Sequence, residues 1–295
     1  MLFNLDLEDF KYNGSSKLHL QKLATSIDPL YKNKSDYRNL MKKYRKKIDE
    51  LQNKMYAHDR YGMLAVFQAM DAAGKDSTIR EVMSGINPHG VEVHAFKKPS
   101  EEELDHSFLW RTNKCMPRRG KIHLFNRSYY EEVLVTRVHP KIVTSYQKIP
   151  AENLKNKKKL WRDRYSAIKS MEQYEHSNGI RIIKFFLNVS KAEQKRRFQN
   201  RLNDPSKNWK FSEHDIEERK HWNAYMEAYE EAINATSTKD APWYVIPADD
   251  KKNMRLVVAN IILSHLESLD MHYPSLSNED LAKLDYYKKQ LQDDQ

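Results

Sequence analysis

The chain has 295 residues, of which 39% are apolar and 31% charged, so it can bury a sizeable core in one large or two small domains beneath a very polar surface. The excess of 51 Lys and Arg over 41 Asp and Glu favours a polyanionic partner such as nucleic acid, an acidic membrane or a phosphate-rich substrate. A single cysteine, Cys115, rules out an intramolecular disulfide. No apolar run has the roughly 20 residues of a membrane span, and the first residues do not resemble a signal peptide. We therefore expect a cytoplasmic protein without a membrane partner.

Residues 1 to about 60 are predicted to form an N-terminal helical extension. After an N-cap at Ser35 and Asp36, apolar residues recur at steps of three and four, as on one face of a helix. Five basic residues between positions 42 and 47 lie largely on the other face. They could form a polyanion patch, but a solvated outer face is the commoner role for such charges.

The stretch 63–78 predicts a buried strand, a tight turn and a helix. In such a turn the first amides of the helix converge on one point that suits a phosphate, and Lys75 adds a positive charge. The pattern G-x-x-x-x-G-K-[ST] would place glycine at 69 and a hydroxyl at 76, whereas this chain has Ala69, Asp76 and, one place later, Ser77. We interpret the stretch as an imperfect phosphate-binding loop (P-loop). By itself it could also be a structural turn around Gly74.

Strand and helix signals then alternate to residue 266. The alternation predicts right-handed βαβ units, a mainly parallel five-stranded sheet with helices on both faces, and ligand binding beyond the carboxyl ends of the strands. Beyond 63–67, the predicted strands are 91–96, 121–125, 180–189 and 243–247. The predicted helices are 77–85, 99–109, 129–138, 153–174, 190–203, 212–233 and 254–266, with a further one in 277–295.

Two polar stretches are predicted to lie at the same end of the sheet as the loop. Residues 126–131 follow the third strand, where P-loop enzymes usually carry a magnesium ligand. The helix after the fourth strand carries Arg197 and Arg201 on one face, and Lys207 and Lys210 follow it. In small-molecule kinases this position is the lid, whose cations cover the transferring phosphoryl group.

At these residues the chain closely resembles the polyphosphate kinase 2 family, which moves phosphoryl groups between inorganic polyphosphate and nucleotides. The resemblance extends, in the right order, over about residues 65 to 255. The segments that carry it are 70–76 (MDAAGKD), 86–88 (INP), 96–100 (FKKPS), 108–111 (FLWR), 125–131 (FNRSYYE), 207–211 (KNWKF) and 241–250 (APWYVIPADD).

The resemblance implies a thymidylate-kinase-like three-layer core at 61–270 with a helical lid at about 195–220 and a C-terminal helical tail at 271–295. It also implies Mg²⁺ or Mn²⁺, a polyphosphate chain in a basic channel, and a homo-oligomer, either a dimer or a tetramer. Carried over to this sequence, it implies a catalytic set of Asp71, Lys75, Arg127 and Glu131, with Asp71 and Glu131 as metal ligands. The nucleotide-binding set is Asp71, Asn126, Arg127 and Arg137, and the phosphate-binding set is Ala73, Gly74, Lys75, Asp76, Ser77, Arg80, Lys97, Arg127, Arg197, Arg201 and Lys210.

One departure from the family pattern is informative. Many members have Asp at the position of Asn126, and a neutral amide is a poorer Mg²⁺ ligand than a carboxylate. Together with Ala69, Asn126 resembles the subgroup that accepts both nucleoside mono- and diphosphates. The expected activity is therefore reversible transfer of the terminal phosphoryl group of polyphosphate to AMP and ADP, giving ADP and ATP.

Two alternatives remain open on sequence grounds. An ATP-dependent nucleoside monophosphate kinase would share the loop, the lid and the sheet. A basic nucleic-acid-binding protein would use the charge of +10 and bind in a strongly salt-dependent way. We find no familiar nucleic-acid-binding module, so we expect no nucleic-acid partner.

Overall fold

The computed structural model describes residues 5–293, and for Lys210 its backbone alone. It contains a six-stranded sheet in the order β1-β6-β5-β2-β4-β3. The five predicted strands are confirmed and run parallel, and β2 lies at the centre between β4 and β5. The strands are β1 (Lys11–Tyr12), β2 (Gly62–Gln68), β3 (Val91–Ala95), β4 (Ile122–Asn126), β5 (Ile180–Asn188) and β6 (Trp243–Pro247).

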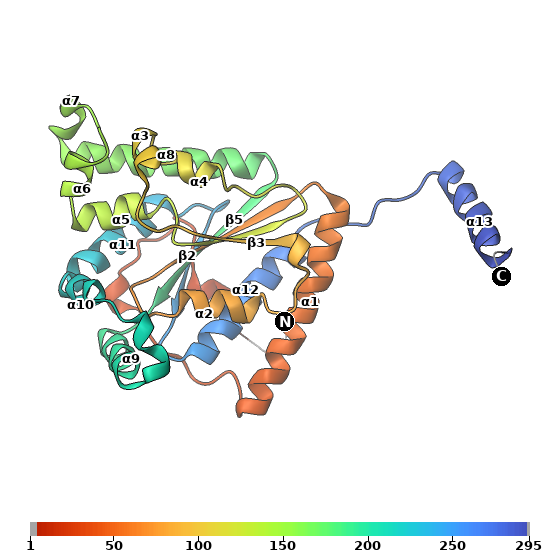
Figure 1. Ribbon diagram of the computed structural model, residues 1–295, viewed down its shortest axis with the longest axis horizontal. Coiled ribbons are helices and arrows are strands. Elements are labelled where there is room, and N and C mark those ends of the chain that lie inside the picture. Colours follow the sequence, from red (N-terminus) through yellow and green to blue (C-terminus); the bar gives the residue numbers. More distant parts are fainter. Residues whose placement is uncertain (1–4, 294–295) are drawn as a thin grey trace.

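The central strand β2 is buried at every position, and β5 at all positions but one. Burial on both faces explains why these strands are continuous apolar runs without alternation. Helices cover the two faces of the sheet (Figure 1). One layer contains α1 (Lys34–His58), α2 (Lys75–Val82) and α12 (Lys251–Glu267), and the other contains α5 (Glu131–Val138), α8 (Lys157–Ser177) and α11 (Trp222–Thr236).

The N-terminal segment corrects the prediction of an all-helical extension. In the described part before residue 34, the chain forms the 3₁₀ turns η1 (Leu7–Phe10) and η2 (Leu20–Lys22) and the strand β1, which pairs antiparallel with β6. Two residues are too short to show a strand period, so β1 left no sequence signal. The segment is held to the core by side chains, since the Leu30 N–H donates to Asn253 Oδ1 at 2.9 Å.

Several helices differ in detail from the predicted ones. The long helix expected at 212–233 is broken at His221, and a short helix, α6, lies between the helices predicted at 129–138 and 153–174. The helix predicted at 99–109 starts with a capping box of Ser100 and Glu103, but it is short and ends at Asp105. The remaining elements are η3 (Pro88–Gly90), α3 (Glu101–Asp105), α4 (Trp110–Asn113), α6 (Lys141–Ser145), α7 (Ala151–Leu154), α9 (Lys191–Asn203), η4 (Pro205–Lys210), α10 (Glu213–Lys220) and α13 (Asn278–Asp293).

The C-terminal helix α13 projects away from the rest of the molecule on an extended segment (Figure 1). It has no buried residue, although it carries leucine and tyrosine side chains. Among the described residues, none of the helices combines the length and the apolar character needed to cross a membrane.

Candidate active site

The loop between β2 and α2 lies at the carboxyl end of the central strand. Gly74 is the N-cap of α2, with a left-handed φ of +113°, and it has no side chain to cap the helix. Ala72 also has a positive φ, of 62°. The first amides of a helix have no intrahelical acceptor, and at this N-terminus no side chain replaces one. The loop therefore presents N–H donors and the positive end of the helix dipole to an anion.

Lys75 is the first residue of α2 and its side chain folds back into the loop. Its Nζ donates to the carbonyl oxygen of Ala69 at 2.7 Å, and the residue is 8% exposed. Burial lowers the pKa of Lys75, as does the nearby positive charge of Arg127, while Asp71 and Glu131 oppose the shift. An anionic ligand at the loop would favour the charged form of Lys75.

Arg127 lies between two carboxylates. Its Nη2 is 3.0 Å from Asp71 Oδ1, and its Nη1 is 3.7 Å from Glu131 Oε2. Its backbone N–H donates to the carbonyl oxygen of Phe67 at 3.0 Å, and its φ of 62° is unusual for a residue with a side chain. Burial raises the pKa of Glu131 while the charge of Arg127 lowers it. The arrangement brings three of the predicted catalytic residues, Asp71, Arg127 and Glu131, together beside Lys75.

Asn126 ends β4 and contacts the first turn of α2. Its Nδ2 donates to Asp76 Oδ1 at 2.5 Å. Asp76 stands where the standard loop pattern has a hydroxyl residue, and Asn126 stands where many family members have Asp. The hydrogen bond therefore joins the two residues that depart from the usual patterns. A carboxylate at 126 would instead face the Asp76 carboxylate and repel it.

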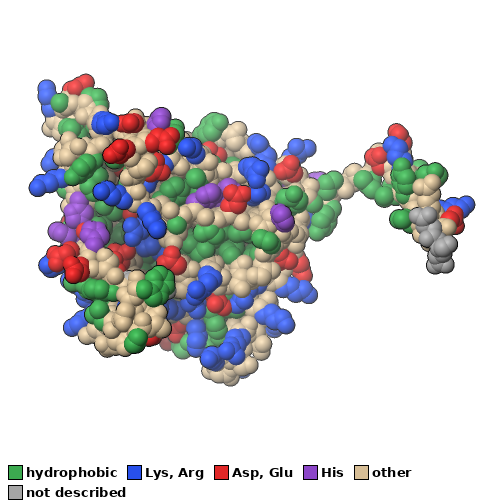
Figure 2. All heavy atoms as spheres, in the orientation of Figure 1, with side chains coloured by type: hydrophobic (Ala, Val, Ile, Leu, Met, Phe, Trp, Pro, Cys, Tyr) green, Lys and Arg blue, Asp and Glu red, His purple; other side chains and the backbone are tan. Residues whose placement is uncertain are grey.

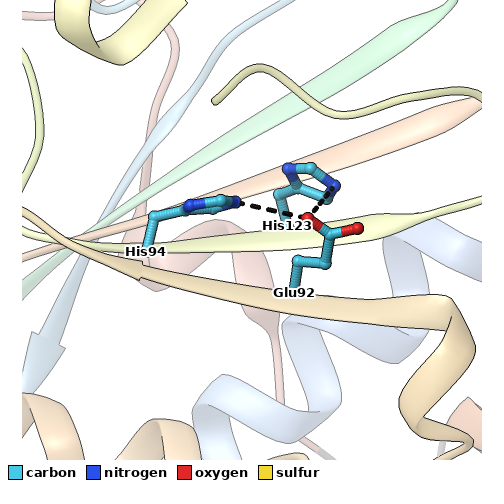
Figure 3. Close-up of side chains that lie close together, drawn as sticks. All are labelled: Glu92, His94 and His123. Carbon is cyan, nitrogen blue, oxygen red and sulfur yellow. Dashed lines mark ion pairs between the residues drawn. The ribbon is translucent and has the colours of Figure 1, made fainter. Parts of the chain in front are cut away.

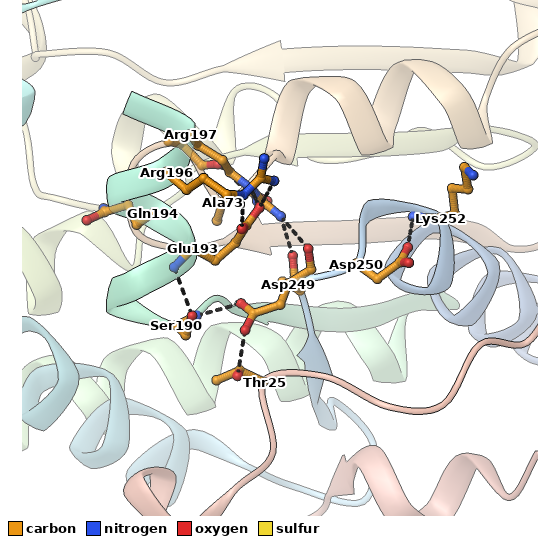
Figure 4. A network of polar contacts seen from close by, with 12 residues as sticks. Thr25, Ala73, Ser190, Glu193, Gln194, Arg196, Arg197, Asp249, Asp250 and Lys252 are labelled. Atoms are coloured by element: carbon orange, nitrogen blue, oxygen red, sulfur yellow. Dashed lines mark hydrogen bonds and ion pairs between the residues drawn. The ribbon is translucent and has the colours of Figure 1, made fainter. Parts of the chain in front are cut away.

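Arg197 is buried beneath the loop, and all five of its N–H donors have an acceptor (Figure 4). Nη1 donates to the carbonyl oxygens of Ala72 and Ala73 at 3.1 and 2.5 Å, and Nη2 donates to those of Ala248 and Asp249 at 2.6 and 3.1 Å. Nε donates to Glu193 Oε1 at 2.7 Å. This geometry lets Arg197 fix the loop from behind and leaves it no free donor for a phosphate.

A second link between α9 and the loop was not anticipated from the sequence. Gln194 Nε2 donates to the Asp71 carbonyl oxygen at 2.9 Å, and Gln194 Oε1 accepts from Arg219 Nη1 of α10 at 2.5 Å. Arg201 pairs with Asp215 of α10 at 3.1 Å. The helices of the predicted lid are thus tied to each other and to the backbone of Asp71.

The other predicted phosphate-binding residues are spread around this centre. Ala73 is buried in the loop, and Ser77 Oγ donates to the Gly74 carbonyl oxygen at 3.0 Å. Arg80 at the end of α2 and Lys97 after β3 are exposed. Lys210 is also predicted to bind phosphate, but its side chain is not among those that the structure describes.

Arg137, predicted to bind nucleotide, is directed elsewhere. It lies in the last turn of α5 and pairs with Glu231 of α11 at 2.6 Å, with its guanidinium 5.6 Å from the centre of the Trp161 ring. These contacts are with the helical layer rather than with the loop. A nucleotide-binding role for Arg137 would require it to leave this ion pair.

Asp71 and Glu131 are the carboxylates that could hold a divalent cation here. Both lie against the same guanidinium, so a cation that replaced or displaced it would find oxygen donors on two sides. Magnesium typically uses one or two protein carboxylates and completes its shell with water and substrate phosphates. This donor set fits Mg²⁺ or Mn²⁺, provided that the substrate supplies the remaining oxygens.

The chain is similar to known proteins over most of its length. The chain is 48% identical over 284 residues to an ADP-polyphosphate phosphotransferase of Rhodopseudomonas palustris, covering 96% of this chain and 98% of the relative. It is 44% identical to an AMP/ADP-polyphosphate phosphotransferase of Meiothermus ruber, covering 78% of this chain and 80% of the relative. The crystal structure of polyphosphate kinase 2 from Arthrobacter aurescens TC1 superposes with a TM-score of 0.83 at 35% identity, over 95% of this chain and 98% of that one.

The family model described as Polyphosphate kinase 2 (PPK2) matches residues 31–274. The match includes the loop, the Asp71–Arg127–Glu131 group and the helices α9 and α10 that are tied to them. The chain therefore belongs to the polyphosphate kinase 2 family.

Proposed function

We propose that this chain is a polyphosphate-dependent nucleotide kinase. It transfers the terminal phosphoryl group of inorganic polyphosphate to AMP and to ADP, giving ADP and ATP, and it catalyses the reverse reactions. The observation that carries the proposal is the meeting of Asp71, Arg127 and Glu131 beside Lys75 at the end of the central strand. Relatives that share most of the chain are named as ADP- and AMP/ADP-polyphosphate phosphotransferases, and this supports the assignment of donor and acceptors.

The chemistry requires positioning and charge more than proton transfer. An oxygen of the nucleotide phosphate forms a bond to the terminal phosphorus of polyphosphate, and the bond from that phosphorus to the bridging oxygen breaks. The donor leaves one unit shorter, with the negative charge on its new terminal oxygen. The attacking phosphate oxygen is already anionic, so no base has to activate it.

Each residue then has a specific task. The loop amides and Lys75 bind the transferring phosphoryl group, and Arg127 binds a phosphate beside it. Asp71 and Glu131 would hold Mg²⁺ or Mn²⁺, which supplies neutralising charge to the phosphate oxygens when bound. Because Arg127 contacts both carboxylates, we expect its guanidinium to turn from them toward phosphate when substrate and metal arrive.

The polyphosphate chain would lie along basic residues around the loop and the predicted lid. Figure 2 shows Lys and Arg side chains spread over the face in view, with Asp and Glu between them. Arg80, Lys97, Arg201 and Lys210 remain our proposed contacts for the donor, with residues of about 195–220 acting as the lid. Arg197 would serve this lid as its attachment to the loop, through the contacts with Ala72 and Ala73.

The acceptance of both AMP and ADP is a finer part of the proposal. It rests on Asn126, which places a neutral amide against Asp76 where many family members have a carboxylate. The resemblance of Asn126 and Ala69 to the family subgroup that uses both kinds of acceptor supports this part of the proposal. This would place the chain in the subgroup that uses both kinds of acceptor.

The surface of α13 bears on assembly. The exposed residues Leu281, Leu284, Tyr287 and Leu291 recur along α13 at steps of three and four, as in a helix that packs against another protein surface. We propose that α13 takes part in a homo-oligomer. A cytoplasmic location, the absence of a nucleic-acid partner, and unit boundaries at residues 60 and 270 are likewise proposals.

An assay with two phosphoryl donors distinguishes this proposal from the alternative, an ATP-dependent nucleoside monophosphate kinase. Purified protein is incubated with AMP and Mg²⁺, and either long-chain polyphosphate or ATP is added as donor. We expect ADP to form rapidly with polyphosphate, and Lys75→Ala to abolish this while circular dichroism shows that the variant is folded. ADP formation with ATP alone, and none with polyphosphate, would refute the proposal.

A further inference from the structure

A second group of chemically reactive side chains lies on the sheet near its β3 edge. Glu92 and His94 are two residues apart on β3 and therefore point to the same face, and His123 on β4 is the register partner of Glu92. Figure 3 shows the two imidazole rings and the carboxylate converging above the strands. In the described part of the chain, this is the one group of three His, Cys, Asp or Glu residues close enough together to hold a metal ion.

The three side chains are nearly placed for coordination. Glu92 Oε2 lies 3.7 Å from His94 Nε2 and 3.7 Å from His123 Nε2, and the potential ligand atoms all lie within 4.8 Å of one another. Ligands bound tetrahedrally at about 2.1 Å from Zn²⁺ are about 3.4 Å apart. Small side-chain rotations would therefore complete the geometry without moving the strands.

Both ring nitrogens that face the carboxylate are buried and have no hydrogen-bond partner among the described residues. The side chain of His123 is only 4% exposed, so the unpartnered nitrogen is not a surface feature. Its Nδ1 lies 2.9 Å from the carbonyl oxygen of Cys115, an acceptor, and so carries the proton. This leaves a lone pair on Nε2 directed toward Glu92.

The carboxylate is held in a matching way. Glu92 Oε1 binds Lys121 Nζ at 2.7 Å and lies 3.5 Å from Arg118 Nη2, so that Oε2 is left for the two rings. Outer contacts of this kind, a carbonyl on one ligand and a cation on another, orient the ligands of metal sites.

We propose that Glu92, His94 and His123 form a binding site for Zn²⁺, with a water molecule as the fourth ligand. Two imidazoles and a carboxylate are ligands that zinc prefers, whereas the magnesium of phosphoryl transfer requires an all-oxygen shell. His123 lies three residues before Asn126 on β4, about 10 Å from the carboxyl end of the strand. The site is thus separate from the phosphate-binding loop, and the metal ties the edge strand β3 to β4.

The test uses the full-length protein, freed of metal by a chelator, and Zn²⁺ or Co²⁺ as the probe. Wild-type protein should bind one equivalent of Zn²⁺ in competition with a chromophoric chelator. Co²⁺ should give the visible absorption bands of a tetrahedral complex. The melting temperature should rise with Zn²⁺ concentration, since the ion binds the folded state.

Three variants locate the ion. His94→Ala and Glu92→Gln should each weaken Zn²⁺ binding by about 100-fold or more, because each removes a ligand, and should lose the Co²⁺ spectrum and the thermal shift. His89→Ala, which removes an exposed histidine just before β3, should behave as wild type. The proposal is overturned if wild type binds no Zn²⁺, if His94→Ala and Glu92→Gln retain full affinity, or if His89→Ala loses affinity as they do. Circular dichroism of the metal-free variants controls for loss of folding.

Discussion

Arg197 Nη1 donates a hydrogen bond to the Ala73 carbonyl oxygen at 2.5 Å, which joins α9 to the phosphate-binding loop. The same guanidinium reaches Ala248 and Asp249 after β6, so one buried side chain joins three segments that are far apart in the sequence. The loop conformation therefore depends on the position of α9. A lid movement that includes α9 would therefore shift or break the hydrogen bonds of Arg197 to Ala72 and Ala73.

Replacing Arg197 with lysine should destabilise the protein even without substrate. Lysine has three donors and no fork, so at least one buried carbonyl of the loop or of the segment after β6 would lose its partner. We expect a loss of about 2–5 kcal/mol in the free energy of unfolding, measured by urea denaturation. Arg196→Ala, which removes an exposed side chain paired with Glu193, should cost less than about 1 kcal/mol. An unchanged stability with reduced activity would instead indicate direct phosphate binding by Arg197.

Asp71→Asn should impair the use of the metal. The amide keeps the shape of the side chain but removes the charge that Arg127 and a divalent cation both need. We expect kcat to fall by about 100-fold or more, and the Mg²⁺ concentration for half-maximal rate to rise. Titration of the rate with Mg²⁺ checks this. A slow variant with normal Mg²⁺ dependence would refute the role of Asp71 as a metal ligand.

At the phosphate-binding loop, local structure could be predicted from the sequence, whereas the tertiary contacts could not. The apolar run before it and the Gly74-Lys75 pair predict the strand, the turn and the helix, because each follows from local patterning. The contacts of Arg197 cannot be predicted from local patterning. Arg197 on α9 has the charge and spacing of a lid residue, and only the packing of α9 against the loop shows that its donors are used by main-chain carbonyls.

Asn126→Asp should change the choice of acceptor. The new carboxylate would lose the hydrogen bond to Asp76, and it would remove the feature by which the chain resembles the subgroup that uses both acceptors. We expect the rate with AMP to fall by about tenfold or more relative to the rate with ADP, which corresponds to about 1.4 kcal/mol of discrimination. Parallel initial-rate assays with the two acceptors at fixed polyphosphate measure the ratio. If the ratio is unchanged, Asn126 does not determine the acceptor.

His265 should make the protein less stable in mild acid. Its Nε2 lies 2.9 Å from the Tyr244 hydroxyl, and burial lowers its pKa from 6.5 to about 4, aided by the charges of Lys11 and Arg181 and opposed by Glu8. In the unfolded chain the group titrates near 6.5. Its contribution to stability is therefore full above pH 6.5 and is lost as the pH falls toward 4.

The size of this loss of stability follows from the difference in the pKa of His265 between the unfolded and the folded protein. Between pH 7 and pH 5, His265 should account for a loss of about 2 kcal/mol in the free energy of unfolding. His265→Gln, which keeps an acceptor for Tyr244, should lose correspondingly less over the same interval. Urea unfolding of both proteins at the two pH values checks this. Equal losses would show that His265 titrates normally in the folded protein.

The group of Glu92, His94 and His123 illustrates a site that the sequence conceals. Glu92 and His94 are two residues apart on a short strand, and His123 lies 29 residues beyond His94 on another strand. Nothing in their spacing indicates that they meet, because the meeting depends on the register of β3 against β4. By contrast, the family resemblance places Asp71 and Arg127 in one catalytic set, and in the structure Arg127 Nη2 lies 3.0 Å from Asp71 Oδ1.

The central claim is that polyphosphate alone can convert AMP stepwise to ATP at this site. The direct measurement is a time course with purified protein, AMP, Mg²⁺ and long-chain polyphosphate, without added ATP, followed by chromatographic separation of the nucleotides. We predict that ADP appears first and that ATP follows as ADP accumulates, with polyphosphate losing one phosphoryl unit for each ADP and two for each ATP formed from AMP. Absence of both products, or ADP that is never converted to ATP, would contradict the claim.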